Sequence, residues 1–191
     1  LLLSGNKRYR FMITREDLEQ LKAYARIDGL ITFGLWILSF ACFVGEFNYP
    51  ALGLVSMLTA LSSVFIVAIR VRRYRDMVVD GAISLRRSYF YCLLVFAYSS
   101  LLFAAAQYVY FQFIDNGYIV SVYSEMTGTP EFKALMSAYG VSHDEINTAI
   151  DGLSNLRPID IAFQFFTTNI VIGTIISFPI ALTTRKRRQK Q

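Results

Sequence analysis

Four long stretches without a charged side chain constrain this sequence more than any other feature. They cover residues 29–45, 47–69, 88–114 and 161–184, and each is bounded on both sides by Asp, Glu or Arg. A helix that crosses a bilayer needs about 20 mostly apolar residues, within a working range of about 17–25. Strands of a membrane barrel have only about 9–11 residues and alternate in polarity, which these stretches do not. We therefore predict an all-α polytopic membrane protein, built as a four-transmembrane-helix bundle.

The four spans are expected over about 29–45, 50–70, 88–114 and 160–184, which gives a membrane domain of residues 29–184. The first two spans are joined by only a few residues, and Pro50 suits the first turn of the second, so an antiparallel hairpin is expected. An outer segment, 116–157, separates the third span from the fourth. Residues 1–28 precede the first span, and residues 185–191 form a basic tail.

The N-terminal segment contains an amphipathic pattern from Thr14 to Arg26. Thr14 is a candidate helix cap, with Asp17 three residues further on, as in a capping box. Leu18, Leu21 and neighbouring apolar residues recur at helical spacing. The pattern fits an interfacial helix that leads into the first span. It fits a helix that docks on a partner equally well, so both interpretations stay open.

Basic residues are distributed very unevenly along the chain. Of the 19 Lys and Arg residues, 17 lie before the first span, between the second and third spans, or in the tail. Only Lys133 and Arg157 lie in the outer segment. Lys and Arg that flank transmembrane helices are retained on the cytosolic side. The sequence therefore predicts that both termini are cytosolic.

The same distribution explains the formal net charge of +5. A basic chain can bind nucleic acid, but here the charge lies beside the ends of spans, at the depth of lipid headgroups. Anionic lipids attract such residues with about 1 kcal/mol each. We therefore expect membrane lipids as partners and no nucleic acid. The residues expected to contact anionic lipid are Arg70, Arg72, Arg73, Arg75, Arg86, Arg87, Arg185, Lys186, Arg187 and Arg188.

Polar side chains gather near the outer ends of the spans, while the inner and middle parts of the four uncharged stretches contain no Asp, Glu, Lys, Arg or His. The functional interpretation is a small polar pocket that opens outward. The alternative is hydrogen bonding between helices, worth about 0.6 kcal/mol per pair, together with anchoring at the interface. We favour the alternative, because such residues are common there. We call these residues the outer polar cluster, which consists of Glu46, Asn48, Tyr108, Gln112, Asp115, Asp160 and Gln164.

No catalytic or metal-binding motif stands out. His143 is the only histidine, and its neighbours Asp144 and Glu145 cannot point at one centre with it. Cys42 and Cys92 are expected at different depths, so no disulfide is expected. Glycine loops that bind phosphate and nucleophile elbows are both missing. We therefore expect no enzymatic activity, no metal and no cofactor.

Helix signals divide the outer segment. Thr129 followed by Pro130 predicts a cap and a first-turn proline, and Gly140 predicts a helix end. Ser142 and Glu145 form a capping box. Two short amphipathic helices are therefore expected, lying on the mouth of the bundle or on the outer membrane surface. In the fourth span, Gly173 and Ser177 form a pair of small residues typical of helix packing.

The stretch Asp80-Gly-Ala-Ile-Ser-Leu-Arg-Arg-Ser-Tyr-Phe90 leads into the third span, which ends in Tyr110-Phe-Gln-Phe-Ile-Asp115. With the outer segment and the basic tail, this pattern resembles the bacterial membrane family catalogued as domain of unknown function 4199, over about residues 27–188. The resemblance implies a four-helix inner (cytoplasmic) membrane protein of Gram-negative bacteria, with no established activity and no functional residues to carry over. Members often have a proline where this chain has Asn116. Their genes often neighbour a membrane-associated family-two glycosyltransferase, which implies a candidate partner.

The leading hypothesis is a non-catalytic integral inner-membrane subunit or scaffold that docks and positions a partner. A membrane glycosyltransferase that uses polyprenyl-phosphate sugars is the candidate partner, and self-association is the other expectation. The alternative is a small transporter or lipid-handling protein that uses the outer polar cluster. An enzyme that acts through Glu46, Asp115 and Asp160 ranks third, because paired carboxylates can serve acid–base chemistry.

Overall fold

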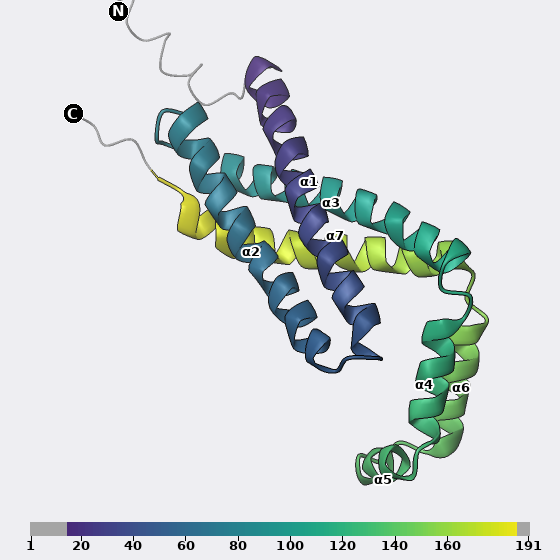
Figure 1. Ribbon diagram of the computed structural model, residues 1–191. Helices are drawn as coiled ribbons and strands as arrows, with labels where there is room; N and C mark the ends of the chain where they lie inside the picture. The colour runs from purple at the N-terminus through teal and green to yellow at the C-terminus, as the bar shows by residue number, and fades with distance from the viewer. Residues whose placement is uncertain (1–14, 187–191) are drawn as a thin grey trace, which may run out of the picture.

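The computed structural model describes residues 15–186, and within this range the chain is all-α (Figure 1). Its seven helices are α1 (Arg15–Glu46), α2 (Ala51–Val78), α3 (Leu85–Phe113), α4 (Tyr118–Gly128), α5 (Pro130–Ala138), α6 (His143–Ser154) and α7 (Pro158–Thr184). Four of these, α1, α2, α3 and α7, are long and apolar enough to cross a membrane. The prediction of four such helices is confirmed.

The first long helix begins earlier than expected. The amphipathic pattern and the expected first span, 29–45, belong to one continuous helix, α1. Gly29, the first residue of the expected span, does not break the helix, since glycine in a helix costs only about 1 kcal/mol relative to alanine. Asp28 is tolerated there because its carboxylate is paired with Arg70 of α2. Thr14, the expected cap, lies outside the described residues.

The other long helices also extend beyond the uncharged stretches. α2 continues through the basic residues to Val78, and α3 begins at Leu85. Ser84 caps α3, because its hydroxyl accepts a hydrogen bond from the backbone N–H of Arg87 at 3.2 Å. Pro158 opens α7 as a first-turn proline.

The four long helices form two antiparallel pairs. α1 packs on α2 and on α3, and α3 packs on α7. In Figure 1 the α1–α2 pair is inclined to the α3–α7 pair. We call the end at which α1 and α3 begin and α2 and α7 end the basic end, and the opposite end the arm end. At the basic end Asp17 pairs with Arg87 at 3.2 Å, and Ile83 forms an antiparallel bridge with Lys186.

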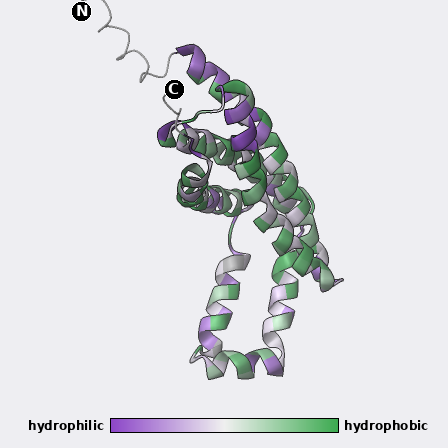
Figure 2. Ribbon diagram, turned by 90° about the vertical axis from the view of Figure 1, so that its left-hand side faces the viewer, coloured by the Kyte–Doolittle hydropathy of each residue, from purple (hydrophilic) through white to green (hydrophobic). Residues whose placement is uncertain are grey.

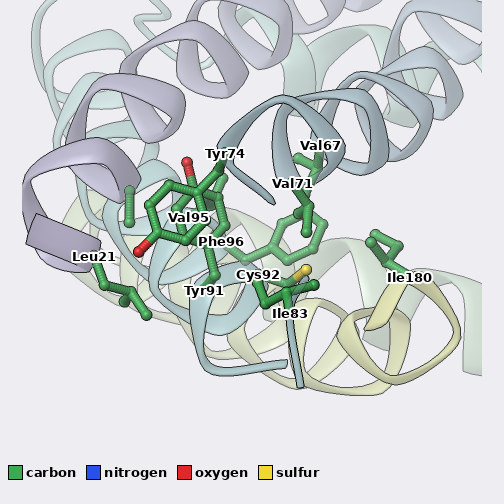
Figure 3. Packing of buried hydrophobic residues seen from close by; sticks show 11 residues of the cluster. Leu21, Val67, Val71, Tyr74, Ile83, Tyr91, Cys92, Val95, Phe96 and Ile180 are labelled. Atoms are coloured by element: carbon green, nitrogen blue, oxygen red, sulfur yellow. The ribbon is translucent and has the colours of Figure 1, made fainter. Parts of the chain in front are cut away.

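The main cluster of buried apolar side chains also lies towards the basic end (Figure 3). Within it the rings of Tyr74 and Tyr91 stack with their centroids 4.5 Å apart. Elsewhere the long helices expose many large apolar side chains, such as Leu54 and Phe65 on α2 and Ile175 on α7. Extensive exposed apolar surface of this kind is what helices in contact with lipid require.

Small residues allow α3 and α7 to approach closely. A Cβ added to Gly173 of α7 would lie 2.7 Å from the Cβ of Phe96 on α3. Ser177 is fully buried, and its hydroxyl donates to the carbonyl of Gly173 at 2.6 Å. The predicted packing role of this pair of small residues is confirmed.

The outer segment forms an arm of three helices, one more than the sequence predicted. α4 and α6 run side by side, and α5 joins them at the tip, away from the long helices (Figure 2). The predicted punctuation is confirmed. Thr129 caps α5 by accepting from the N–H of Phe132 at 3.3 Å, Gly140 has φ +78°, and Glu145 accepts from the N–H of Ser142 at 2.8 Å.

Candidate functional site

Asp115 is the most buried member of the outer polar cluster, with 6% of its surface exposed. Its two carboxylate oxygens accept hydrogen bonds from the backbone N–H groups of Gly117, at 3.1 Å, and Ile119, at 3.2 Å. The carboxylate therefore caps the start of α4. Asn116, between Asp115 and Gly117, has φ +46°, a left-handed conformation that proline cannot adopt. The turn after α3 in this chain thus excludes the proline that the family resemblance implies.

The other members of the outer polar cluster have local partners or none. Asn48 donates to the hydroxyl of Tyr118 at 3.2 Å, and Asp160 pairs with the exposed Arg157 at 2.8 Å. Glu46 lies against Gly53 of α2. Gln112 and Gln164 are exposed, and Tyr108 is half-buried. Among the described residues, no hydrogen bond or ion pair joins two members of the cluster.

An apolar cavity of about 450 Å³ lies at the arm end, with Asp115 among the residues that line it. Asp115 is the only member of the outer polar cluster that lines this cavity. The walls come from α1, α3, α4, α6 and α7, and include Phe40, Phe111, Tyr123 and Phe165. The cavity can hold an apolar group, but it brings no set of polar groups together.

At the basic end the structure contains a buried ionic site, centred on the carboxylate that directly precedes the first expected span. Asp28 of α1 is only 2% exposed. Its Oδ1 atom accepts from Nε of Arg70 on α2 at 2.6 Å and lies 2.5 Å from Nη2 of the same side chain. The hydroxyl of Tyr91 on α3 donates to Oδ2. One carboxylate therefore joins three long helices.

The antiparallel packing of α1 and α2 brings Asp28 opposite Arg70. Nε1 of Trp36 donates to Oγ of Ser63 at 3.1 Å, and Ser39 and Ser56 each donate to the other's backbone carbonyl, in the same register. A carboxylate buried without a partner is strongly unfavourable, and a paired and hydrogen-bonded one is tolerated. The ionic site therefore explains why a charged residue can occupy the buried face of α1.

A second ion pair extends the ionic site towards the start of α1. Nη2 of Arg87 donates to the hydroxyl of Tyr74 at 3.1 Å and to Oδ1 of Asp17 at 3.2 Å. Tyr74 stacks on Tyr91 (Figure 3). The hydrogen bonds and the stacked rings form one network across α1, α2 and α3.

A polar cavity of about 290 Å³ opens beside the ionic site. Besides Asp28, Arg70, Tyr74 and Tyr91, it is lined by Tyr24 of α1 and by Arg73, Met77 and Val78 of α2. We call it the basic-end cavity. Arg73 is exposed, and within residues 15–186 its guanidinium has no acidic partner, only a contact from Nε to the sulfur of Met77 at 3.4 Å.

Of the ten basic residues expected to contact anionic lipid, eight are described, and Arg187 and Arg188 lie outside the described residues. All eight lie at the basic end. Arg70, Arg75 and Arg87 have acidic partners, and Arg75 also donates to the carbonyl of Thr184 at 2.9 Å. The exposed members are Arg72, Arg73, Arg86, Arg185 and Lys186.

A signal for the ionic site was present in the sequence. Leu21, Ala25, Asp28 and Thr32 follow the spacing of one helical face, and all four are buried. Extending the amphipathic pattern of the N-terminal segment through Asp28 would have placed this carboxylate on the packed face. Asp28 interrupts the run of uncharged residues, and this conceals the continuity of the helix in the sequence.

The arm is acidic and little of it is buried. Residues 118–157 contain five acidic and two basic side chains, and none of the described side chains of α5 is buried. Hydrogen bonds from the backbone and hydroxyl of Ser142 lower the pKa of Glu145. The hydrogen-bonded Asp160 raises the pKa of Arg157. No group of three or more His, Cys, Asp or Glu among the described residues could hold a metal ion.

Comparison with known proteins gives one match. A family model described as "Protein of unknown function (DUF4199)" matches residues 28–186, a range that begins at Asp28 and includes α2, α3, the arm and α7. No curated protein and no solved structure matches significantly. The comparisons therefore supply a family and no activity.

Proposed function

The chain belongs to the DUF4199 family of proteins of unknown function, and from this premise we propose that it is a non-catalytic, multi-pass membrane subunit that docks and positions a protein partner. The proposal places the chain in a bacterial inner membrane with the basic end in the cytosol. It rests for orientation on the 17 of 19 basic residues that flank this end or continue from it. The arm then stands on the outer side.

The arm is the observation that carries this proposal. Its three short helices pack mainly on one another and stand away from the four long helices (Figures 1 and 2). Leu135 of α5 is 51% exposed, and Tyr139, the residue that directly follows α5, is 76% exposed. The two are four residues apart, the spacing of one helical face. Helices this short are marginal in water without tertiary packing. A partner that covers this face would supply that packing.

The net negative charge of the arm favours a protein over a membrane surface as the partner that covers it. An anionic membrane surface attracts basic segments, whereas the arm has five acidic and two basic residues. Electrostatic complementarity favours a protein with a basic surface and apolar pockets. The candidate partner is a membrane glycosyltransferase that uses polyprenyl-phosphate sugars, and its support is the gene neighbourhood implied by the family resemblance.

We expect Leu135→Glu to release this partner. The substitution places an unpaired charge inside the contact, which is strongly unfavourable, so retention should fall by at least about tenfold. The measurement is crosslinking in cells, followed by purification of the tagged full-length chain in mild detergent and mass spectrometry. Ser137→Glu is the matched control, because it adds the same charge on the opposite face of α5.

One stoichiometric partner that is retained by Ser137→Glu and lost by Leu135→Glu would support docking through the arm. Equal retention by both variants would contradict the use of this face. The absence of any crosslinked partner in the unmodified chain would contradict the docking function itself.

The 450 Å³ cavity at the arm end favours a second function, that of a small transporter or lipid-handling protein. Its apolar walls could hold part of a lipid chain, with Asp115 of the outer polar cluster among the lining residues. Lipid transfer or solute flux by the purified protein in liposomes, without any partner, would favour this second function over docking.

A further inference from the structure

We propose that the basic-end cavity binds the phosphate group of an anionic lipid, held by Arg73 and by the guanidinium of Arg70 that Asp28 keeps in place. This site lies at the opposite end of the long helices from the arm. It is independent of the docking function, and neither proposal requires the other.

Arg70 is oriented before any ligand arrives. A guanidinium has five N–H donors in a rigid plane, and Asp28 engages Nε and Nη2 on one edge of that plane. Nη1 of Arg70 has no partner within residues 15–186. The side chain is 23% exposed and lines the cavity. Its remaining donors are therefore available to an acceptor in the cavity, at little further cost in side-chain entropy.

The charged side chains around the cavity leave one positive charge without a paired carboxylate. Asp28 neutralises Arg70, and Asp17 neutralises the neighbouring Arg87. Both oxygens of Asp28 are engaged, by Arg70 and by the hydroxyl of Tyr91. Arg73, one turn after Arg70 on α2, brings a positive charge that no described carboxylate balances.

Phosphate is the anion that this arrangement fits. Guanidinium groups bind phosphate oxygens through paired, charge-assisted hydrogen bonds. Two arginines one turn apart can present donors to different oxygens of one phosphate. Tyr24 also lines the cavity, whereas the hydroxyl of Tyr91 is already donated to Asp28. The site thus combines one net positive charge with spare donors.

The surroundings of the cavity indicate a lipid as the source of the phosphate. Met77 and Val78 form an apolar part of its wall. Next to the ionic site, Ile31 of α1 and Ile69 of α2 are exposed apolar residues on the long helices. A headgroup in the cavity would leave its acyl chains along this apolar surface. A soluble phosphate would gain nothing from it.

The test is native mass spectrometry of the purified full-length chain, titrated separately with phosphatidylglycerol, phosphatidic acid, zwitterionic phosphatidylcholine and inorganic phosphate. We expect one tightly retained anionic lipid and at least tenfold weaker binding of phosphatidylcholine. Arg73→Gln should weaken the binding of anionic lipid by about tenfold. Arg26→Gln is the matched control, because it removes an exposed arginine at the basic end of α1 that does not line the cavity, and it should change binding by less than about twofold.

Equal losses in Arg73→Gln and Arg26→Gln would overturn the proposal in favour of general attraction to the basic surface. Equal binding of phosphatidylcholine would overturn the anionic character of the site. If inorganic phosphate binds with the same dependence on Arg73 and displaces the lipid at equal concentration, the lipid source is overturned. Arg70→Lys keeps the charge but loses the planar fork, so weaker lipid binding with unchanged thermal unfolding would support the assigned role of the guanidinium.

Discussion

Asp28→Ala is expected to lower the free energy of unfolding by about 3–5 kcal/mol, the usual cost of removing one partner from a buried ion pair. The substitution leaves Arg70 without its carboxylate and the hydroxyl of Tyr91 without its acceptor. Because the carboxylate joins α1, α2 and α3, we expect loss of contacts among all three helices. The measurement is thermal unfolding of the purified protein in detergent.

The control for Asp28→Ala is Asp76→Ala. Asp76 also pairs with an arginine of α2, Arg75 at 2.7 Å, but its side chain is exposed. Exposed ion pairs contribute little to stability, so the control should unfold at nearly the wild-type temperature. Equal unfolding temperatures for the two variants would show that the ionic site does not stabilise the packing of the long helices.

A compensated variant separates the burial of a charge from the loss of packing. Replacing the set together, as Asp28→Leu, Arg70→Met and Tyr91→Phe, removes every polar atom that needs a partner. Apolar replacements of a whole buried ion pair are often neutral or stabilising. The triple variant should therefore be more stable than Asp28→Ala, although by our proposal it would no longer bind anionic lipid.

Gly173→Ala is expected to destabilise the contact between α3 and α7 by about 1–3 kcal/mol, as overpacking of a well-packed core does. The added Cβ would lie 2.7 Å from the Cβ of Phe96, closer than carbon atoms can approach. The helices would have to move apart. Thermal unfolding in detergent measures this effect as well.

Gly34→Ala in α1 is the matched control, because a Cβ added there has no heavy atom within 4 Å. Alanine is a better helix former than glycine by about 1 kcal/mol, so this variant should be neutral or more stable. Effects of the same sign at both glycines would contradict the close approach of α7 to Phe96.

The parts of the fold that depend on local sequence could be predicted. Four long apolar helices follow from the uncharged stretches, and the caps at Thr129 and Ser142 follow from short-range hydrogen bonding. The pair Gly173 and Ser177 was recognisable because small residues at this spacing are typical of helix contacts. Each of these features depends only on residues that are close together in the sequence.

The ionic site could not be predicted in the same way. Asp28 and Arg70 are 42 residues apart in the sequence, and Tyr91 is 63 residues from Asp28. Only the register of α1 against α2 and α3 brings them together. A carboxylate without a partner is costly inside a membrane, so the sequence alone places Asp28 outside the spans. Its partner, Arg70, is identified only by the packing of α1 against α2.

α4 was missed for a different reason. Its residues include Val, Ile and Tyr, which have modest helix propensity, and its first residue follows a turn with two positive φ angles. The backbone N–H groups at its start are capped by Asp115. The cap comes from a member of the outer polar cluster, and the sequence does not reveal that this carboxylate folds back onto the backbone.

The membrane topology is tested most directly by cysteine labelling. In a chain with Cys42→Ala and Cys92→Ala, Ser137→Cys places a thiol on α5 and Asp76→Cys places one at the basic end. A maleimide that crosses the outer membrane but not the inner membrane should label Ser137→Cys in intact cells. It should label Asp76→Cys only after the inner membrane is permeabilised. Labelling of Asp76→Cys in intact cells, or protection of Ser137→Cys, would contradict a chain with a cytosolic basic end and an outer arm.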